Sequence, residues 1–395
     1  MRVGLDLHTL GGIMQGSRTY IAALAARLPA AAPDIRFVFY VTEPGRAAAL
    51  ALAAGAPNVT LAPIPAGRTG RLIAPFPQRL AREVDVFHCQ YLAPLTPTVP
   101  CVITLHDILH ETMPQYFPRG LSSLMRLLYP RSARRAAMVL TVSDYCRSEI
   151  MARYGVAPER VAFVHSGLDA AFAPVTDPPV LAGLRERLGI PDSPYILSLG
   201  RIEPRKNLPG LVAAYRLLRA RLGAAAPLLV IAGPDDGLFA AFGAQIRGSG
   251  GGEGIIFCGG VPQADLPGLL SGAAVLAYPS FGEGFGLPVI EAMACGTPVV
   301  ASTAPAVAEV AGGAALLVNP HDTAGLADAL CRVLTDPPLA RDMAARGLLR
   351  AAGFDWNNAV TLALTAYRRA VDGRKRGEGR RGLRRPGGII PPGPP

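Results

Sequence analysis

Two glutamates, at positions 283 and 291, flank a glycine-rich turn. An apolar run at residues 275–278 precedes the turn, and Pro288 suits the first turn of a following helix because its missing N–H would be unpaired there. Glycines let the backbone approach a ligand closely. The first amides of that helix should therefore point at a phosphate or at sugar hydroxyls. The two carboxylates can face opposite ends of a ligand held by the amides of Phe285, Gly286 and Leu287.

The alternative interpretation of this segment is an ordinary strand–turn–helix unit with two solvated glutamates. A lone glycine loop would favour that interpretation, because such loops are common. The longer pattern around Glu283 and Glu291 favours a binding site.

Arg201 and Lys206 are the second set of candidates, on a loop that follows the apolar run at residues 195–199. Arg can bind phosphate oxygens through a fork of N–H groups, and Lys adds a mobile point charge. Together they suit a diphosphate leaving group. The alternative is that these two cations form surface salt bridges with Glu203. Asn207 is the expected N-cap of the next helix.

From Glu283 onward the chain reads EGFGLPVIEAMACGTPVV. This segment resembles the signature of the GT-B retaining glycosyltransferases, a family that includes many bacterial mannosyl- and glucosyltransferases. The resemblance implies that Glu283 binds donor-sugar hydroxyls, that Glu291 binds the ribose of the nucleotide, and that the amides between them contact sugar and phosphate. It also assigns Arg201 and Lys206 to the family's diphosphate clamp.

The resemblance, which covers nearly the whole chain up to Asp372, implies roles for three further positions. His106 would face the donor sugar across a cleft, although its spacing alone fits equally well a structural histidine that bonds a neighbouring strand. Gly12 would approach the donor phosphates, in a loop that is longer than the family's usual form. Val261 would lie near the nucleotide base.

Alternating strand and helix signals position these residues. Apolar runs recur at residues 3–7, 35–41, 59–64, 84–88, 99–105, 138–142 and 161–164, and again at 195–199, 228–232, 255–257, 275–278, 299–301 and 315–318. Such alternation predicts parallel sheets covered on both faces. Ser143 is expected to cap the helix that follows it. We therefore predict an α/β fold of GT-B architecture, in which two Rossmann-like, doubly wound domains face each other across a cleft.

The predicted boundaries follow from these signals and from the resemblance. Residues 1–175 form an N-terminal acceptor-binding domain, and residues 190–355 form a C-terminal domain that binds the nucleotide sugar. Residues 356–372 form a closing helix that returns to the first domain. Residues 373–395 hold seven basic residues and one acid, which accounts for six of the ten formal positive charges, and their Gly and Pro content predicts a disordered tail.

Composition limits location and partners. The six cysteines form no C-x-x-C pair, no apolar run is long enough to span a membrane, and Asp6 interrupts the N-terminus too early for a signal peptide. These features predict a cytoplasmic protein. The basic tail lacks aromatic residues for base stacking, so specific nucleic-acid binding is not expected.

The segment at residues 118–135 carries leucines and arginines at helical spacing. A basic amphipathic helix can lie on an anionic membrane surface, here the inner face. In the alternative, its leucines lie in the core and its arginines in solvent.

The resemblance implies a retaining hexosyltransferase that moves a sugar from a UDP- or GDP-sugar to a hydroxyl of a glycan or lipid-linked acceptor. The general pattern of the first domain is more similar to that of mannosyltransferases in cell-surface polysaccharide synthesis. The alternatives are a sugar-nucleotide epimerase or phosphorylase of the same fold, and a non-catalytic nucleotide-sugar binding module. No further cofactor is expected.

The chain contains no D-x-D motif that could hold a divalent metal on the donor diphosphate, so the expected metal set is none. Arg201, Lys206 and the helix amides would neutralise the leaving group instead. We expect turnover to survive excess EDTA. Loss of turnover that Mg²⁺ or Mn²⁺ restores would contradict this prediction.

Overall fold

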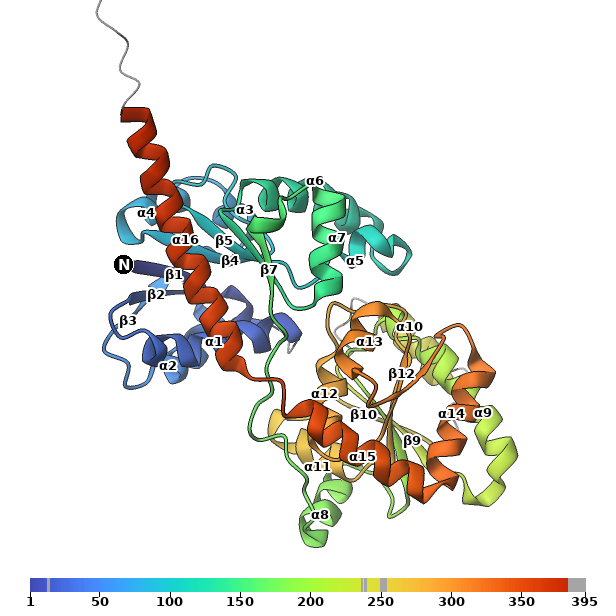
Figure 1. Ribbon diagram of the computed structural model, residues 1–395. Helices are drawn as coiled ribbons and strands as arrows, with labels where there is room; N and C mark the ends of the chain where they lie inside the picture. The colour runs from blue at the N-terminus through green and yellow to red at the C-terminus, as the bar shows by residue number, and fades with distance from the viewer. Residues whose placement is uncertain (13–14, 236, 238–239, 249–253, 383–395) are drawn as a thin grey trace, which may run out of the picture.

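The computed structural model describes residues 1–12, 15–235, 237, 240–248 and 254–382. The chain forms two lobes, each built around a parallel sheet with helices on both faces (Figure 1). The fold class predicted from the sequence is confirmed.

The N-terminal domain contains a seven-stranded sheet in the order β3-β2-β1-β4-β5-β6-β7. Its strands are β1 (Arg2–Asp6), β2 (Arg36–Val41), β3 (Val59–Pro63), β4 (Val86–Gln90), β5 (Cys101–Thr104), β6 (Met138–Thr141) and β7 (Val161–Phe163). Its helices are α1 (Gly16–Ala31), α2 (Arg46–Ala53), α3 (Arg68–Leu72), α4 (Phe76–Glu83), α5 (Leu109–Thr112), α6 (Arg119–Arg135) and α7 (Asp144–Tyr154).

The C-terminal domain contains a six-stranded sheet in the order β10-β9-β8-β11-β12-β13. Its strands are β8 (Tyr195–Leu199), β9 (Leu228–Ala232), β10 (Ile255–Gly259), β11 (Val275–Tyr278), β12 (Val299–Ser302) and β13 (Leu316–Val318). Its helices are α8 (Pro178–Leu188), α9 (Leu208–Leu222), α10 (Ala240–Gly248), α11 (Leu266–Ser271), α12 (Leu287–Ala294), α13 (Pro305–Ala311), α14 (Thr323–Thr335) and α15 (Pro337–Ala351).

Each sheet reverses its strand order once, between β1 and β4 in the first domain and between β8 and β11 in the second. The crevice outside the carboxyl ends of the strands at such a point is the usual ligand site of an open α/β sheet. The loops after β1, β8 and β11 carry the candidate residues. Because the central strands of each sheet are buried on both faces, they read as the continuous apolar runs seen in the sequence.

Two chain segments connect the domains and run side by side (Figure 1). The Leu168 amide donates to the Phe354 carbonyl at 3.1 Å. A Cβ at Gly167 would lie 2.2 Å from the Trp356 nitrogen, so only glycine allows this approach. The second segment leads into α16 (Trp356–Gly382), which packs on α1 and on the sheet of the N-terminal domain.

Helix α16 is fixed to that sheet by a buried polar contact. The Tyr367 hydroxyl lies 2.7 Å from His88 Nδ1, and His88 Nε2 lies 2.7 Å from the Thr104 hydroxyl. Burial lowers the pKa of His88 to about 4, so the ring is neutral at neutral pH. Both of its nitrogens are satisfied, as a buried imidazole requires.

The predicted disorder from residue 373 onward is wrong for residues 373–382, because α16 continues to Gly382. Arg, Lys and Glu are good helix formers, and an established helix adds residues without a new nucleation cost. The glycines at 373, 377 and 379 oppose the helix by only about 1 kcal/mol each. Residues 383–395 lie outside the described part of the chain.

Three local features also differ from or refine the sequence analysis. Ser143 caps α7 as predicted, since its hydroxyl accepts from the Cys146 amide at 3.2 Å. Asn207 occupies the N-cap position of α9, as predicted, but its side chain makes no capping hydrogen bond: the residue adopts φ +55°, and its side-chain amide donates to the Pro320 carbonyl at 2.7 Å. Residues 176–189, left between the predicted domains, contain α8, which packs on α11 of the C-terminal domain.

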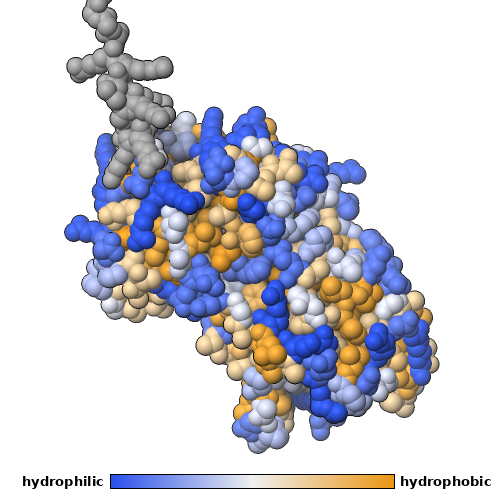
Figure 2. Space-filling model, viewed as in Figure 1, coloured by the Kyte–Doolittle hydropathy of each residue, from blue (hydrophilic) through white to orange (hydrophobic). Residues whose placement is uncertain are grey.

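Within the described residues, no helix combines the length and the hydropathy needed to cross a membrane. Figure 2 shows hydrophilic and hydrophobic side chains interspersed over both lobes in one view.

Candidate active site

The glycine loop (residues 282–286) connects β11 to α12 and lies against the N-terminal domain. Gly286 adopts φ +121° at the start of α12, a conformation that side chains rarely allow. A Cβ at Gly284 would lie 2.3 Å from the His106 carbonyl oxygen. The amides of Phe285 and Gly286 form no hydrogen bond within the described residues, which leaves them available to a ligand.

Glu283 lies at the centre of a buried ion cluster. Lys206 Nζ donates to Glu283 Oε1 at 2.7 Å and to the Tyr278 hydroxyl at 2.8 Å. Arg205 Nη1 donates to Glu283 Oε2 and, at 3.2 Å, to the Gly282 carbonyl. Lys206 was expected to bind the donor diphosphate, not Glu283, and Arg205 was not among the candidates; its only signal in the sequence is that it is a further basic residue in the same short loop.

The electrostatics of the cluster keep Glu283 charged. Burial by itself would raise the carboxyl pKa, but Arg205 and Lys206 outweigh it and lower the pKa to about 2. The cations therefore compensate a charge that would otherwise be costly to bury. The two side chains fix the glycine loop to the loop that follows β8.

Arg201 lies at the edge of the same cluster, bridged by Glu203. Arg201 Nη1 lies 2.9 Å from Glu203 Oε1, and Arg205 Nε lies 2.6 Å from Glu203 Oε2. The ion pair that the sequence offered as an alternative does form, but Glu203 is buried, so it is not a surface pair. Arg201 also contacts Gln15 Oε1 of the N-terminal domain at 3.4 Å, which places it at the junction of the domains.

Glu291 lies in α12, and its carboxylate has no hydrogen-bond partner within the described residues. The side chain is buried, and this burial raises its pKa to about 7. A buried carboxyl without a partner is expensive to ionise. Hydroxyl donors from a ligand would supply the missing hydrogen bonds and favour the charged form.

His106 follows β5 and is hydrogen-bonded to the neighbouring strand, as the structural alternative predicted. Its Nε2 lies 2.7 Å from Gln90 Oε1, at the end of β4. Burial, with a smaller effect of His88, lowers the pKa of His106 to about 3, so the ring is neutral. With its proton on Nε2, the ring keeps Nδ1 as an acceptor. The rings of Tyr20 and Tyr91 lie 5.1 and 5.4 Å away.

The loop after β1 also reaches the second domain. Arg18 Nη1 donates to the Gly12 carbonyl at 2.7 Å, which turns the loop back on itself. Gly16, at the start of α1, lies next to α12: a Cβ at this position would be 3.6 Å from Leu287 Cδ1, which is ordinary van der Waals contact. Residues 13–14 of this loop lie outside the described residues.

Val261 lies two residues beyond β10 and is partly buried against the core. Within the described residues, no three His, Cys, Asp or Glu side chains gather in a way that could hold a metal ion. Turnover without a metal stays a prediction.

Comparison with known proteins agrees with this geometry. Residues 183–350 match the model of glycosyl transferases group 1, and residues 14–172 match that of Glycosyltransferase Family 4. The O-antigen chain mannosyltransferase B of Escherichia coli is 36% identical over 272 residues, which cover 68% of this chain and 70% of that protein. The chain belongs to the glycosyl transferases group 1 family. It is an enzyme that transfers sugars, as the resemblance implied.

Two further relatives are similar to this chain over a smaller share of their own length. The serotype-specific mannosyltransferase WbdA of E. coli is 31% identical over 240 residues, which make up 60% of this glycosyltransferase but only 29% of WbdA. D-inositol 3-phosphate glycosyltransferase 1 of Catenulispora acidiphila is 36% identical over 234 residues, 57% of this chain and 55% of that protein.

Solved structures show the same fold at low identity. Sucrose-phosphate synthase from Thermosynechococcus elongatus superposes with a TM-score of 0.72 at 22% identity, covering 94% of this chain and 99% of that one. Anabaena HepE, solved in complex with UDP-glucose, gives 0.71 at 21% identity over 93% and 100% of the two chains. These likenesses establish the two-domain GT-B architecture.

We expect Arg205→Gln to lower the free energy of unfolding by about 3–5 kcal/mol at pH 7, because it leaves the buried Glu283 carboxylate with one cation fewer. In the wild-type enzyme the ionised Glu283 contributes stability above its ordinary pKa of 4.5, and this contribution is lost as the pH falls toward about 2. In the variant the pKa rises, so protonation relieves part of the destabilisation at pH 4.

Urea unfolding at pH 7 and pH 4 checks this prediction. Arg153→Gln is the matched control, because Arg153 pairs with Glu149 on an exposed face of α7. Equal, small losses of stability in both variants would contradict a compensating role for Arg205.

Proposed function

We propose that this enzyme transfers a hexose, mannose in the favoured case, from a nucleotide diphosphate sugar to a hydroxyl of a glycan or lipid-linked acceptor. The observation that carries the proposal is the ion cluster around Glu283, placed beside the open amides of Phe285 and Gly286. Mannose as the transferred sugar and cell-surface polysaccharide as the product are supported by the relative from E. coli, which is named an O-antigen chain mannosyltransferase.

The donor would lie along α12. Helix amides and the cations Arg201, Arg205 and Lys206 would neutralise the diphosphate. The Glu291 carboxylate would accept hydrogen bonds from the ribose, and Glu283 from the sugar hydroxyls. Neutral His106 would offer Nδ1 to a donor-sugar hydroxyl from the other domain.

We further propose retention of the anomeric configuration. The acceptor oxygen would form its bond to the anomeric carbon on the face from which the diphosphate oxygen departs, and the acceptor proton would pass to that departing oxygen. The protein then contributes position and stabilisation of the developing phosphate charge. A sugar-nucleotide epimerase or phosphorylase would use the same donor site, and product analysis with and without inorganic phosphate separates these reactions.

Glu283→Gln should lower kcat, while Glu291→Gln should weaken binding of the nucleotide diphosphate. Loss of one charged hydrogen bond costs about 1.5–3 kcal/mol, or roughly ten- to hundredfold. Nucleotide affinity of the wild-type enzyme should also fall as the pH drops through about 7, where Glu291 becomes protonated, and Glu291→Gln should lack this dependence.

The measurement uses GDP-mannose and UDP-glucose as donors and GDP and UDP for calorimetry between pH 6 and pH 8. Transfer from neither class of donor would refute the proposed function. Normal binding of both nucleotides by Glu291→Gln, together with weakened binding by Glu283→Gln, would show that the two roles are reversed.

We also propose a peripheral membrane contact, which α6 would make. The alternative that all leucines of this segment lie in the core is wrong, because Leu124 and Leu127 are 40% and 50% exposed. Basic residues accompany them on the same helix: Arg119, Arg126, Arg131, Arg134 and Arg135. Apolar side chains beside cations fit the surface of an anionic bilayer. Membrane attachment from the cytoplasmic side agrees with a lipid-linked acceptor.

We expect the enzyme to sediment with vesicles that contain anionic lipid, and to do so less at high salt. Replacing both Leu124 and Leu127 by Glu should reduce binding by about tenfold or more, because it removes apolar area that the bilayer would bury. Leu349→Glu is the control, as Leu349 is 78% exposed on α15 of the other domain. Equal binding by both variants would exclude α6 as the contact.

A further inference from the structure

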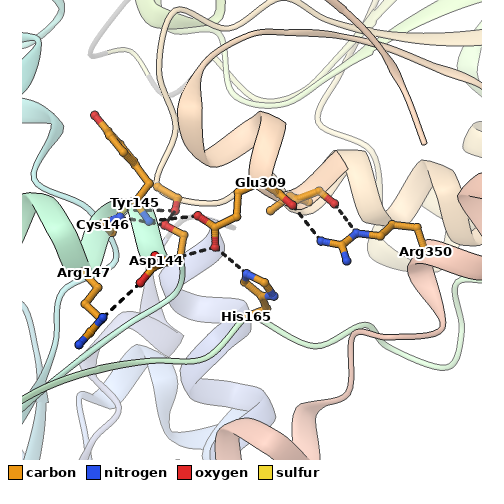
Figure 3. A network of polar contacts seen from close by, with 10 residues as sticks. Asp144, Tyr145, Cys146, Arg147, His165, Glu309 and Arg350 are labelled. Atoms are coloured by element: carbon orange, nitrogen blue, oxygen red, sulfur yellow. Dashed lines mark hydrogen bonds and ion pairs between the residues drawn. The ribbon is translucent and has the colours of Figure 1, made fainter. Parts of the chain in front are cut away.

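A carboxylate of the C-terminal domain reaches the N-terminal domain (Figure 3). Glu309 lies in α13, and its side chain accepts hydrogen bonds from the first amides of α7. The distances are 2.9 Å from the Asp144 nitrogen and 3.0 Å from the Tyr145 nitrogen. The negative charge thus lies at the positive end of the α7 dipole, where anions are stabilised.

The same carboxylate binds the segment that links the domains. His165 Nε2 lies 2.7 Å from Glu309 Oε1. The His165 ring in turn lies 5.7 Å from the ring of Phe285, in the glycine loop, and 5.5 Å from that of Phe354. Glu309 therefore connects α7, the interdomain segment and, through His165, the glycine loop.

The start of α7 also holds the glycine loop directly. The Ser143 hydroxyl donates to the Gly284 carbonyl at 2.8 Å, while the Cys146 thiol lies 3.4 Å from the same oxygen. Gly284 in turn packs on the His106 carbonyl. Any shift of α7 relative to α13 would move the glycine loop relative to His106.

Glu309 is itself presented by a supported helix. Arg350 of α15 donates to the Glu309 carbonyl at 2.8 Å and to the Val310 carbonyl at 2.9 Å, near the C-terminal end of α13 (Figure 3). The side chain is 22% exposed. Burial disfavours its charged form, but the bonds from His165 and from the α7 amides outweigh this effect and lower its pKa. The contact is a charged and partly desolvated one, stronger than an exposed ion pair.

We propose that Glu309 is a positioning residue that fixes the glycine loop, and with it Glu283 and the open amides, opposite His106. The inference rests on the proposed function for the meaning of that alignment. Within the described residues, all three hydrogen bonds of the Glu309 carboxylate leave its own domain. Its removal should leave each domain intact and change only how the two are held together.

The proposal separates two steps of the reaction. Apart from Gly12, the predicted nucleotide contacts belong to the C-terminal domain, among them Glu291 and the amides that begin α12, whereas transfer needs both domains in register. Loss of Glu309 should therefore slow transfer without weakening nucleotide binding. It should also raise the fraction of donor lost to water, because a poorly closed cleft excludes water less well.

The experiment compares Glu309→Gln with Glu149→Gln, a control on α7 whose carboxylate pairs with Arg153 at 2.6 Å. For Glu309→Gln we expect an affinity for the nucleotide diphosphate within about twofold of wild type, a kcat lower by about tenfold or more, and a higher ratio of donor hydrolysis to transfer. The control should match wild type in all three measurements.

A second readout does not depend on the substrate. Small-angle X-ray scattering of the unliganded enzyme should show a larger radius of gyration for Glu309→Gln than for the control. An unchanged radius with unchanged kcat in folded Glu309→Gln would overturn the proposal. A parallel fall in nucleotide affinity, kcat and melting temperature would also overturn it, by showing a structural role. A changed radius in an enzyme that uses neither donor would refute the proposed function but not the positioning contact.

Discussion

The arrangement of the cleft depends on one buried charge. Glu283 can be ionised inside the protein only because Arg205 and Lys206 lie within hydrogen-bond distance, and both come from the loop after β8. The requirement to compensate this charge ties the two loops at the switch point of the second sheet to each other. Tyr278 and Glu203 extend the same network to the neighbouring strand end and to Arg201. The result is a cluster of charged side chains beside the open amides of Phe285 and Gly286.

The opposite wall of the site belongs to the other domain, so its position depends on how the domains are joined. Helix α16 returns to the N-terminal sheet and is held there through His88 and Tyr367. The two connecting segments are hydrogen-bonded to each other at Leu168 and Phe354. These contacts restrict relative movement of the domains. The close approach of Gly284 to the His106 carbonyl depends on the domains keeping this arrangement.

Local patterns in the sequence predicted most of the architecture. Every apolar run named from the sequence corresponds to a strand, because strands buried on both faces need continuous apolar residues. Other expectations failed where the outcome depended on packing. Asn207 lies at the N-cap position of α9, but its side chain bonds to Pro320 and not to the helix amides. Helix α16 continues past Gly373 because an established helix tolerates a few glycines. Leu124 and Leu127 are exposed because α6 turns other residues inward.

The sequence by itself determined the strand and helix order, the glycine loop and the spacing of Glu283 and Glu291, since these follow from local propensity and periodicity. Only the tertiary structure decided which cations neutralise Glu283, that Glu291 is buried without a partner among the described residues, and that Gln90 is the residue bonded to His106. It also decided the contact between Glu309 and α7, whose residues lie more than 160 positions apart in the chain. Sequence patterns report the neighbours of a residue along the chain, whereas charge compensation and domain contacts depend on distances in space that folding alone creates.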